Sequence, residues 1–600
     1  MKKTYNFMKK VRSLIKNPYI LAVLSYAAVL YQLDTYSNYN AYKFLFLIAF
    51  IGIVVLFKKF NFNSVEKRLR KYSIILSSII SAILIVGRTV MKNEFIPTAN
   101  LFTLKSIIFN IIFTIFLIPL IYICIVHMFK FLEKLKLSKD KTIKNKWFWV
   151  ISFIVICLGK IPYLLSFYPA NMTIDSFNVI NLFESGSLFN QHPVAFTYFF
   201  GAIYSLGKLI LGKGSIAICF YSIFQIIIIA LILTWLLNYL NKKGVNKYII
   251  YILLLYFSLS PDYGYMSMTL WKDVLFGIAF IPLVLSMTKM AESDVKNEKI
   301  RIKHLIIFIV ASLMILFFRH NGIYIYILAA ISIPFLFKKN IKILSIVPTS
   351  MIIIYFIVTG PIYNKINVIP GKTVETYSVL LQQVGRVYLK NGDVDKESDK
   401  YFRDIIEVES LEEKYLTWIA DPMKNLTNTE KLKNSQSEFF RAWFKTFLKN
   451  PGIYIESFLS SSVGYWYPDV VYISVREGGG GTSGHYDVTK HGIYRESLMP
   501  EKIVEFFRLI TNKRLPLVMV VWSLGLSFLL LLTSFVLSLY FKIKNQYYFI
   551  YFPLIALWLT NVVAAPVYCE YRYIYGMIVC NILLCAVPLI YKNNAIRIIK

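Results

Sequence analysis

Runs of apolar residues long enough to cross a lipid bilayer recur along most of this 600-residue chain. Residues 517–539, LVMVVWSLGLSFLLLLTSFVLSL, contain no charged side chain. A run of about 18 or more apolar residues with few charges is typical of a membrane-spanning helix, because lipid offers no partner to an unpaired backbone group. The sequence therefore predicts an all-α polytopic membrane protein.

The composition agrees with a lipid environment. Hydrophobic residues make up 57% of the chain and charged residues 16%, against about 25% charged residues in an average soluble domain. We expect about 14 transmembrane helices, a helix at the outer interface and a mainly helical extracytoplasmic domain. The predicted spans are residues 18–33, 42–57, 72–88, 106–128, 147–168, 214–240, 248–260, 271–290, 304–319, 322–338, 341–360, 515–541, 546–565 and 573–591.

The distribution of charge gives these helices a direction. The formal net charge is +33, yet residues 361–514 contain 20 acidic and 21 basic residues, so the excess lies in short loops between apolar runs. Lys and Arg beside spanning helices mark the cytoplasmic side and contact anionic lipid. The pattern argues against nucleic-acid binding. It predicts a multi-pass protein of the cell membrane, with both termini cytoplasmic and residues 361–514 outside.

One segment decides the sidedness of the first half of the chain. If residues 193–212 cross the membrane, the basic loop NKKGVNK faces outward. If they lie at the outer interface, every strongly basic loop stays inside, and we favour this arrangement because it violates the positive-inside rule least. The basic N-terminus precedes an apolar run without an evident cleavage site, so we expect a retained first helix.

These boundaries divide the chain into four predicted parts. Residues 1–146 form an N-terminal block of four spans, and residues 147–360 form a transmembrane core with a first outer loop at 169–192. Residues 361–514 form the extracytoplasmic domain, and residues 515–600 carry three C-terminal spans.

Ionisable residues near helix ends gather on the predicted outer side. Charged groups at membrane depth are costly and tend to mark function, although charges at helix ends also serve as simple anchors. The candidates outside the large domain are Asp175, His192, Asp262, Lys272, Asp273, Arg319, His320, Glu570, Arg572 and Tyr573.

Asp175 lies in the first outer loop, shortly after a predicted span. A partly desolvated carboxylate has a raised proton affinity and can act as a general base. The alternative is a capping or solvated acid, with Thr173 or Asp175 opening a helix at Ser176.

The other outer loops are equally open to two interpretations. Lys272 beside Asp273 suits a phosphate next to a hydroxyl ligand, but Trp271 and Asp273 also fit an interfacial anchor and a helix start. Arg319 and His320 supply phosphate donors in a turn that Asn-Gly explains by itself. The segment with Glu570, Arg572 and Tyr573 could belong to the same site, and it also fits an interfacial anchor for the last span.

The order of these motifs resembles a known family. YPxxxxxD, HP, TLWKD, RHNG and a late AP with E-x-R-Y occur in this order between residues 147 and 592, as in multi-pass bacterial glycosyltransferases of the GT-C superfamily. The resemblance is closest to a poorly characterised branch of that superfamily. The four preceding spans are an added N-terminal block.

This resemblance implies sugar transfer from a polyprenyl-phosphate donor to an acceptor on the outer face, with inversion. It implies that Asp175 is the base or acceptor-orienting group, that Asp262 or Asp273 is a second acid, and that Lys272, Arg319 and Arg572 hold the lipid phosphate. The first loop has one Asp rather than the paired acids of some relatives, and no WWD signature occurs. A divalent metal is therefore possible but not indicated.

The predicted outer domain offers candidate acceptor contacts. Planar amides and carboxylates recognise sugars, and aromatic rings stack on them, which singles out Glu375, Gln382, Gln383, Arg386 and Trp466. A solvated helix face and an interfacial aromatic belt are the alternatives. The glycine-rich residues 476–487 lack the GK[ST] of a nucleotide site and predict a mobile loop, possible as a lid.

The leading hypothesis is thus a membrane glycosyltransferase whose partners are the bilayer, a polyprenyl-phosphate sugar and a glycan or lipid-linked acceptor. The alternatives are a transporter or flippase of a lipid-linked or polar solute, and a polymerase or ligase of lipid-linked glycans. A transporter is expected to carry intramembrane charges near the midplane and internal repeats, and neither is evident in the sequence.

Overall fold

The computed structural model describes residues 17–33, 43–92, 96–470, 482–483, 486–510 and 520–592, and these are almost entirely helical. Ten helices in the described residues are long and apolar enough to cross a membrane, and four more apolar helices are shorter. The chain is therefore a polytopic helical membrane protein. Each of the fourteen predicted spans overlaps a helix, while the number that cross stays a prediction.

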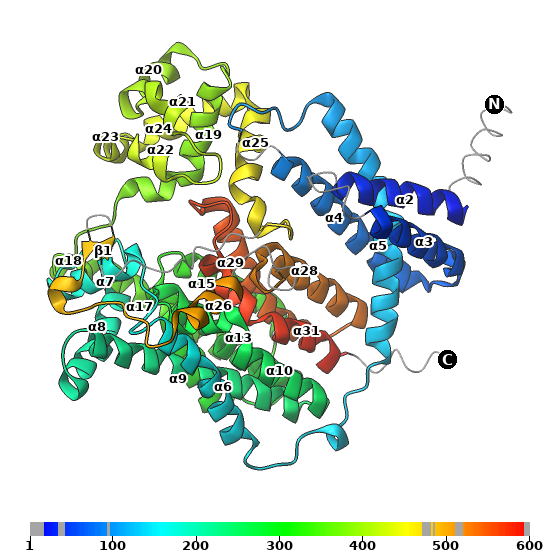
Figure 1. The fold of residues 1–600 in the computed structure, drawn as a ribbon, viewed down its shortest axis with the longest axis horizontal. Coiled ribbons are helices and arrows are strands. Elements are labelled where there is room, and N and C mark those ends of the chain that lie inside the picture. The colour runs from blue at the N-terminus through cyan, green and yellow to red at the C-terminus, as the bar shows by residue number, and fades with distance from the viewer. Residues whose placement is uncertain are drawn as a thin grey trace.

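The N-terminal block consists of four helices that pack on one another at one side of the molecule (Figure 1). They are α2 (Pro18–Leu33), α3 (Lys43–Lys59), α4 (Lys67–Lys92) and α5 (Leu104–Lys134). Only 22% of the apolar stretch of α5 is buried, so its outer surface suits contact with lipid. Gln32 donates a 2.7 Å hydrogen bond to the Tyr467 hydroxyl and joins the block to the rest of the chain.

The central bundle is built around α12 and α13. In the stretch Lys272–Val295, 89% of the apolar window is buried, against 17% in Ile341–Lys365. The helices before the outer domain are α6 (Phe148–Ser166), α7 (Ile174–Glu184), α8 (Val194–Leu211), α9 (Ser215–Lys242), α10 (Lys247–Leu259), α11 (Pro261–Met268), α12 (Lys272–Ile278), α13 (Phe280–Val295), α14 (Ile302–Phe318), α15 (Gly322–Ile331), α16 (Ile333–Leu336) and α17 (Ile341–Ile357), which continues through a π-helical turn (Val358–Ile362) into α18 (Tyr363–Lys365).

The C-terminal helices complete the bundle. They are α28 (Leu524–Phe541), α29 (Tyr551–Ala564), α30 (Tyr575–Val579) and α31 (Asn581–Ile590), with 3-10 turns at Asn545–Ile550 and Tyr571–Ile574. α29 packs on α15, α30 packs on α12, and α31 packs on α28. The last helices therefore contact the most buried part of the bundle.

Helix α8 is long enough to cross a membrane, but its two ends lie on the same side of the bundle. His192, just before α8, contacts Lys272 in the outer loops. Ser215, just after the helix, bonds to Tyr494, and the nearby Glu496 backbone N–H donates to the Tyr168 carbonyl. These contacts favour the predicted placement of residues 193–212 along the interface.

A separate body of short helices lies beside the bundle (Figure 1). It contains α19 (Ser378–Leu389), α20 (Lys396–Ile405), α21 (Leu411–Lys414), α22 (Asp421–Asn425), α23 (Thr429–Asn434) and α24 (Gln436–Lys449). Its own hydrophobic core runs from Val374 to Ala442. We call this body the outer domain, after the side of the membrane predicted for it from loop charge; it covers part of the predicted domain at residues 361–514.

The remainder of the predicted domain packs on the bundle instead. α25 (Pro451–Ser462) links the outer domain to α4 and α29, and α26 (Glu501–Ile510) packs on α6. Two paired strands, β1 (Thr482–Ser483) and β2 (Tyr486–Asp487), lie between them in the chain.

The core of the outer domain allows a stability test. Phe402 is fully buried there, whereas Phe440 on the same domain is 49% exposed. We expect Phe402→Ala to lower the free energy of unfolding of this domain by about 3–5 kcal/mol, because it leaves a cavity. Hydrogen exchange of the amides of α19–α24 should accelerate at least about 100-fold, and the control Phe440→Ala should change it little. Equal effects of both substitutions would contradict the separate core.

Candidate functional site

Two outer loops that are distant in sequence are joined by backbone hydrogen bonds. The Asn171 N–H donates to the Met268 carbonyl (2.9 Å), and the Asn171 carbonyl accepts from the Leu270 N–H (3.1 Å). The Trp271 indole N–H donates to Thr173 Oγ1 at 2.7 Å. Since α7 begins directly after Thr173 and α12 directly after Trp271, the first turns of these two helices lie side by side.

Asp175 occupies the first turn of α7, which Thr173 caps. Its carboxylate accepts a hydrogen bond from Arg572 Nη1 and forms an ion pair with it. The Asp175 side chain is 35% exposed and that of Arg572 16% exposed. The guanidinium of Arg572 also lies 4.6 Å from the centre of the Trp271 ring and 3.7 Å from Glu570 Oε1. The last outer loop is thereby held against the first.

The remaining cations surround this pair. Lys272 Nζ lies 2.8 Å from His192 Nδ1. Arg319 Nη1 pairs with Asp273 Oδ1 at 3.1 Å and donates to the Tyr573 carbonyl at 3.2 Å. We name Asp175, His192, Lys272, Asp273, Arg319, Glu570, Arg572 and Tyr573 the outer cluster.

The tight turn between α14 and α15 carries Arg319. Arg319 is the C-cap of α14, and a Cβ atom on Gly322 would lie 1.8 Å from the Ile315 carbonyl oxygen, so the turn requires glycine. Asn321 Nδ2 donates to Thr560 Oγ1 at 3.2 Å. His320 is exposed at this turn.

Asp262 belongs to a buried network next to the outer cluster. It is fully buried and accepts hydrogen bonds from Ser260, from the Tyr571 hydroxyl at 3.2 Å and from the Tyr256 hydroxyl at 3.4 Å. Tyr571 directly precedes Arg572, so this network positions the turn that carries the arginine.

The charges of the outer cluster keep Asp175 ionised. Burial alone raises the pKa of Asp175, but the positive charges of Arg572 and Lys272 outweigh it and hold the pKa below the usual range of an aspartate. The predicted rise in proton affinity is therefore wrong for this structure. Burial and the Lys272 charge lower the pKa of His192 to about 3, so its neutral ring accepts a hydrogen bond from the lysine ammonium group.

The predicted acceptor residues lie in or beside the outer domain, and most have internal partners. Gln382 donates to the carbonyls of Leu416 and Ile419, and Gln383 accepts from the Trp443 indole. Arg386 is 1% exposed and bonds to Ser460 and the Ala99 carbonyl, and the Trp466 indole donates to Ser462. Glu375 is partly exposed, pairs with Lys424 at 2.6 Å and lies 3.5 Å from Gln191 Nε2. Glu375 is thus the one of these five residues with a contact to the first outer loop.

Two backbone contacts hold the outer domain beside the outer cluster, and the sequence carries no signal for them. The Asn190 N–H donates to the Ile369 carbonyl at 2.8 Å, next to His192. The Ala420 N–H donates to the Pro566 carbonyl at 2.7 Å, in the loop that leads to Glu570. The first and last of the four loops that supply the cluster are therefore joined to the outer domain or to the segment that leads into it.

Two sequence-based hypotheses remain without a geometric counterpart. Residues 476–487, interpreted as a loop or lid, lie mostly outside the described residues. Within the described part of the chain, no group of three or more His, Cys, Asp or Glu side chains is placed to hold a metal ion.

Comparison with known proteins gives one match. A family model described as a family of unknown function (DUF6020) matches residues 35–597. No curated protein and no solved structure matches the chain.

The ion pair between Asp175 and Arg572 predicts a measurable coupling. We expect Arg572→Gln to lower the free energy of unfolding by about 1–3 kcal/mol, because a charge-assisted hydrogen bond is lost. The double variant with Asp175→Asn should be less destabilised than the sum of the single changes. Thermal unfolding in detergent measures this. The control Arg403→Gln breaks an exposed pair with Asp399 and should change stability by less than about 1 kcal/mol.

The same pair predicts a pH dependence. Because the pKa of Asp175 is lowered in the folded protein, its stabilising effect is complete above the ordinary aspartate pKa of about 3.9 and is lost as pH falls below that value. The stability difference between the wild type and Asp175→Asn should stay constant from pH 8 to 5 and narrow below about pH 4. A difference that grows on acidification would contradict the lowered pKa.

Proposed function

We propose that this chain, which belongs to the family of unknown function DUF6020, is a membrane glycosyltransferase that uses a polyprenyl-phosphate sugar at the outer face of the membrane. The observation that carries the proposal is the outer cluster, where an ionised carboxylate from the first loop meets Lys272 and Arg572. A sugar bound through phosphate needs cations for its leaving group and an acceptor for the hydroxyl proton. The cluster contains both.

The reaction assigns one role to each kind of side chain. The acceptor hydroxyl oxygen forms a bond to the anomeric carbon, and the bond from that carbon to the phosphate oxygen breaks. The electron pair leaves with the polyprenyl phosphate, whose negative charge Lys272, Arg572 and Arg319 stabilise. The hydroxyl proton passes to the carboxylate of Asp175. Attack from the face opposite the phosphate inverts the anomeric configuration.

The existing ion pair suggests how donor binding prepares Asp175. Lys272 pairs with a neutral histidine rather than a carboxylate, so it is the cation best placed to take a phosphate. A phosphate that also contacts Arg572 competes with Asp175 for the guanidinium. Asp175 then loses its strongest favourable charge and its pKa rises, which makes it a better base with the donor bound.

The outer domain is suited to the acceptor side of the reaction. It contacts the first loop through Glu375 and the last loop through Ala420, so an acceptor held there reaches the cluster from outside the bundle. Glu375 and its partner Lys424 form the partly exposed polar edge nearest the first loop. We assign acceptor contacts to this edge rather than to the buried Gln382 and Arg386.

The bundle interior argues for an enzyme over a transporter. Residues 274–285 of the central helices and 305–311 of α14 contain no polar side chain. A transporter places its substrate site near the bilayer midplane between such helices. The charged groups of the outer cluster lie instead at helix ends and in loops, as surface chemistry requires.

The first test addresses Asp175. Asp175→Asn removes the proton acceptor while keeping side-chain size, so we expect transfer to fall at least about 1,000-fold with unchanged expression and membrane insertion. Loss of transfer is measured in reconstituted vesicles with a polyprenyl-phosphate sugar, after comparison of envelope glycans in the wild-type and deletion strains has identified the missing sugar. The control Glu412→Gln changes an exposed acid of the outer domain and should leave transfer unchanged. Wild-type activity of Asp175→Asn would refute the assignment.

The second test addresses sidedness. In a cysteine-free background, we expect the thiol introduced by Glu412→Cys to react with a membrane-impermeant maleimide in intact cells. The thiol introduced by Lys58→Cys, in the basic last turn of α3, should react only after permeabilisation. The expectation follows from loop charge. The reverse pattern of labelling would place the outer cluster in the cytoplasm and exclude the proposed substrate side.

A further inference from the structure

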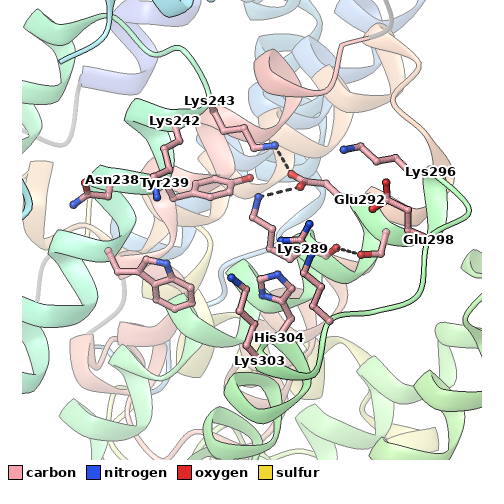
Figure 2. Close-up of a pocket in the computed structure, with 13 residues that line it drawn as sticks. Asn238, Tyr239, Lys242, Lys243, Lys289, Glu292, Lys296, Glu298, Lys303 and His304 are labelled. Atoms are coloured by element: carbon pink, nitrogen blue, oxygen red, sulfur yellow. Dashed lines mark hydrogen bonds and ion pairs between the residues drawn. The ribbon is translucent and has the colours of Figure 1, made fainter. Parts of the chain in front are cut away.

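A second polar site lies at the other end of the bundle. A cavity of about 330 Å³ opens where α9 and α13 end and α14 begins, and its lining residues converge from these three helices (Figure 2). α12 and α13 run from Lys272 in the outer cluster to Glu292 at this cavity. Twenty residues of helix rise roughly 30 Å, the thickness of a bilayer core. The cavity therefore lies at the opposite membrane boundary.

Positive charge dominates the lining. Six Lys or Arg side chains and two glutamates line the cavity. Glu292 is already occupied, since it pairs with Lys243 and, at 2.9 Å, with Lys289 and accepts from the Tyr591 hydroxyl. Glu298 is the remaining acid. The six cations thus exceed the two glutamates by four charges among the described lining residues.

The uncompensated cations come from separate elements. Lys242 ends α9, Lys296 is the C-cap of α13, and Arg301 is the N-cap of α14. Lys303 lies in the first turn of α14. None of these four pairs with a carboxylate in the part of the chain that the structure describes. Like charges gathered from three helices repel one another, so a bound anion would stabilise this arrangement.

The cavity also contains an unused hydrogen-bonding atom. His304 Nδ1 is buried and has no hydrogen-bond partner among the described residues. Trp235 and Tyr239 form an aromatic wall on the α9 side, as expected at a lipid boundary. A ligand with several oxygen acceptors would satisfy the four cations together.

We propose that this cavity binds a phosphate group that carries two or more negative charges. A singly charged carboxylate would leave most of the excess charge in place, whereas a phosphomonoester or diphosphate offers several acceptor oxygens and matches it. The group belongs either to the headgroup of an anionic phospholipid or to a small soluble phosphate compound. The site is independent of the proposed transfer reaction, because it lies roughly 30 Å from the outer cluster.

The test compares two variants with equal loss of charge. Lys242→Gln, Arg301→Gln and Lys303→Gln together remove three exposed cations from the cavity. Lys58→Gln, Lys59→Gln and Lys67→Gln together remove three exposed cations from the helix ends that flank the loop between α3 and α4. Purified protein in neutral detergent is titrated with pyrophosphate by calorimetry. In parallel, binding of phosphatidic acid against phosphatidylcholine is measured by native mass spectrometry.

We expect the wild type to bind at least one of the two phosphate probes, and the cavity variant to bind it at least about tenfold more weakly, with the loop variant unchanged. Binding of phosphatidic acid alone identifies a lipid headgroup, and binding of pyrophosphate identifies a soluble ligand. Equal weakening in both variants would show a general charge effect and overturn the proposal. Failure of the wild type to bind either probe would overturn it as well.

Discussion

The guanidinium of Arg572 connects the parts of the molecule on which the outer end depends. It bonds to Asp175 from the first loop, lies over the Trp271 ring from the second and stays near Glu570 in its own loop. A guanidinium at a membrane boundary is stable only when such partners satisfy it. The same contacts therefore fold three distant loops together and place the proposed base next to a cation proposed to hold the phosphate.

The central helices α12 and α13 give this assembly a rigid support. They are the most buried stretch of the candidate spans, and close packing leaves little room for side-chain displacement. Lys272 and Asp273 begin this stretch, and Lys289 and Glu292 lie near its end. Two charged regions are thus held at fixed separation by an apolar stretch with no polar side chain in residues 274–285.

Hydropathy and loop charge were sufficient to predict much of this architecture. Each of the fourteen predicted apolar runs overlaps a helix, because lipid permits few alternatives to an internally bonded helix. Sidedness then predicted that Asp175, Lys272, Arg319 and Arg572 would face the same way. In the structure Arg572 pairs with Asp175, Lys272 contacts His192 and Arg319 pairs with Asp273, all within the outer cluster. The same rule predicts that residues 193–212 lie along the interface, and the contacts at the two ends of α8 favour this prediction.

What the sequence could not reveal depends on contacts between distant residues. The pKa of Asp175 is lowered rather than raised because Arg572, almost four hundred residues later, is its partner. Gln382 and Arg386 lie on an amphipathic helix whose polar side chains face carbonyls and Ser460 instead of solvent. Helical periodicity shows which residues share a face but not what that face meets. The basic cavity was missed because its lysines also serve as the topology signal.

The balance of charge distinguishes the two ends of the bundle. In the outer cluster three cations, Lys272, Arg319 and Arg572, face three carboxylates, and two of the cations are already engaged in ion pairs. An anion that reaches Arg319 or Arg572 must displace a carboxylate, so contact with Arg572 alters Asp175. In the basic cavity the cations outnumber the acids, so an anion adds to the site without displacing a partner. An anion that displaces Asp175 from Arg572 changes the charge beside that carboxylate, which suits a catalytic step. Cations without a carboxylate partner can hold an anion without altering another residue, which suits ligand retention. The two ends are therefore built for different tasks, although the same helices carry both.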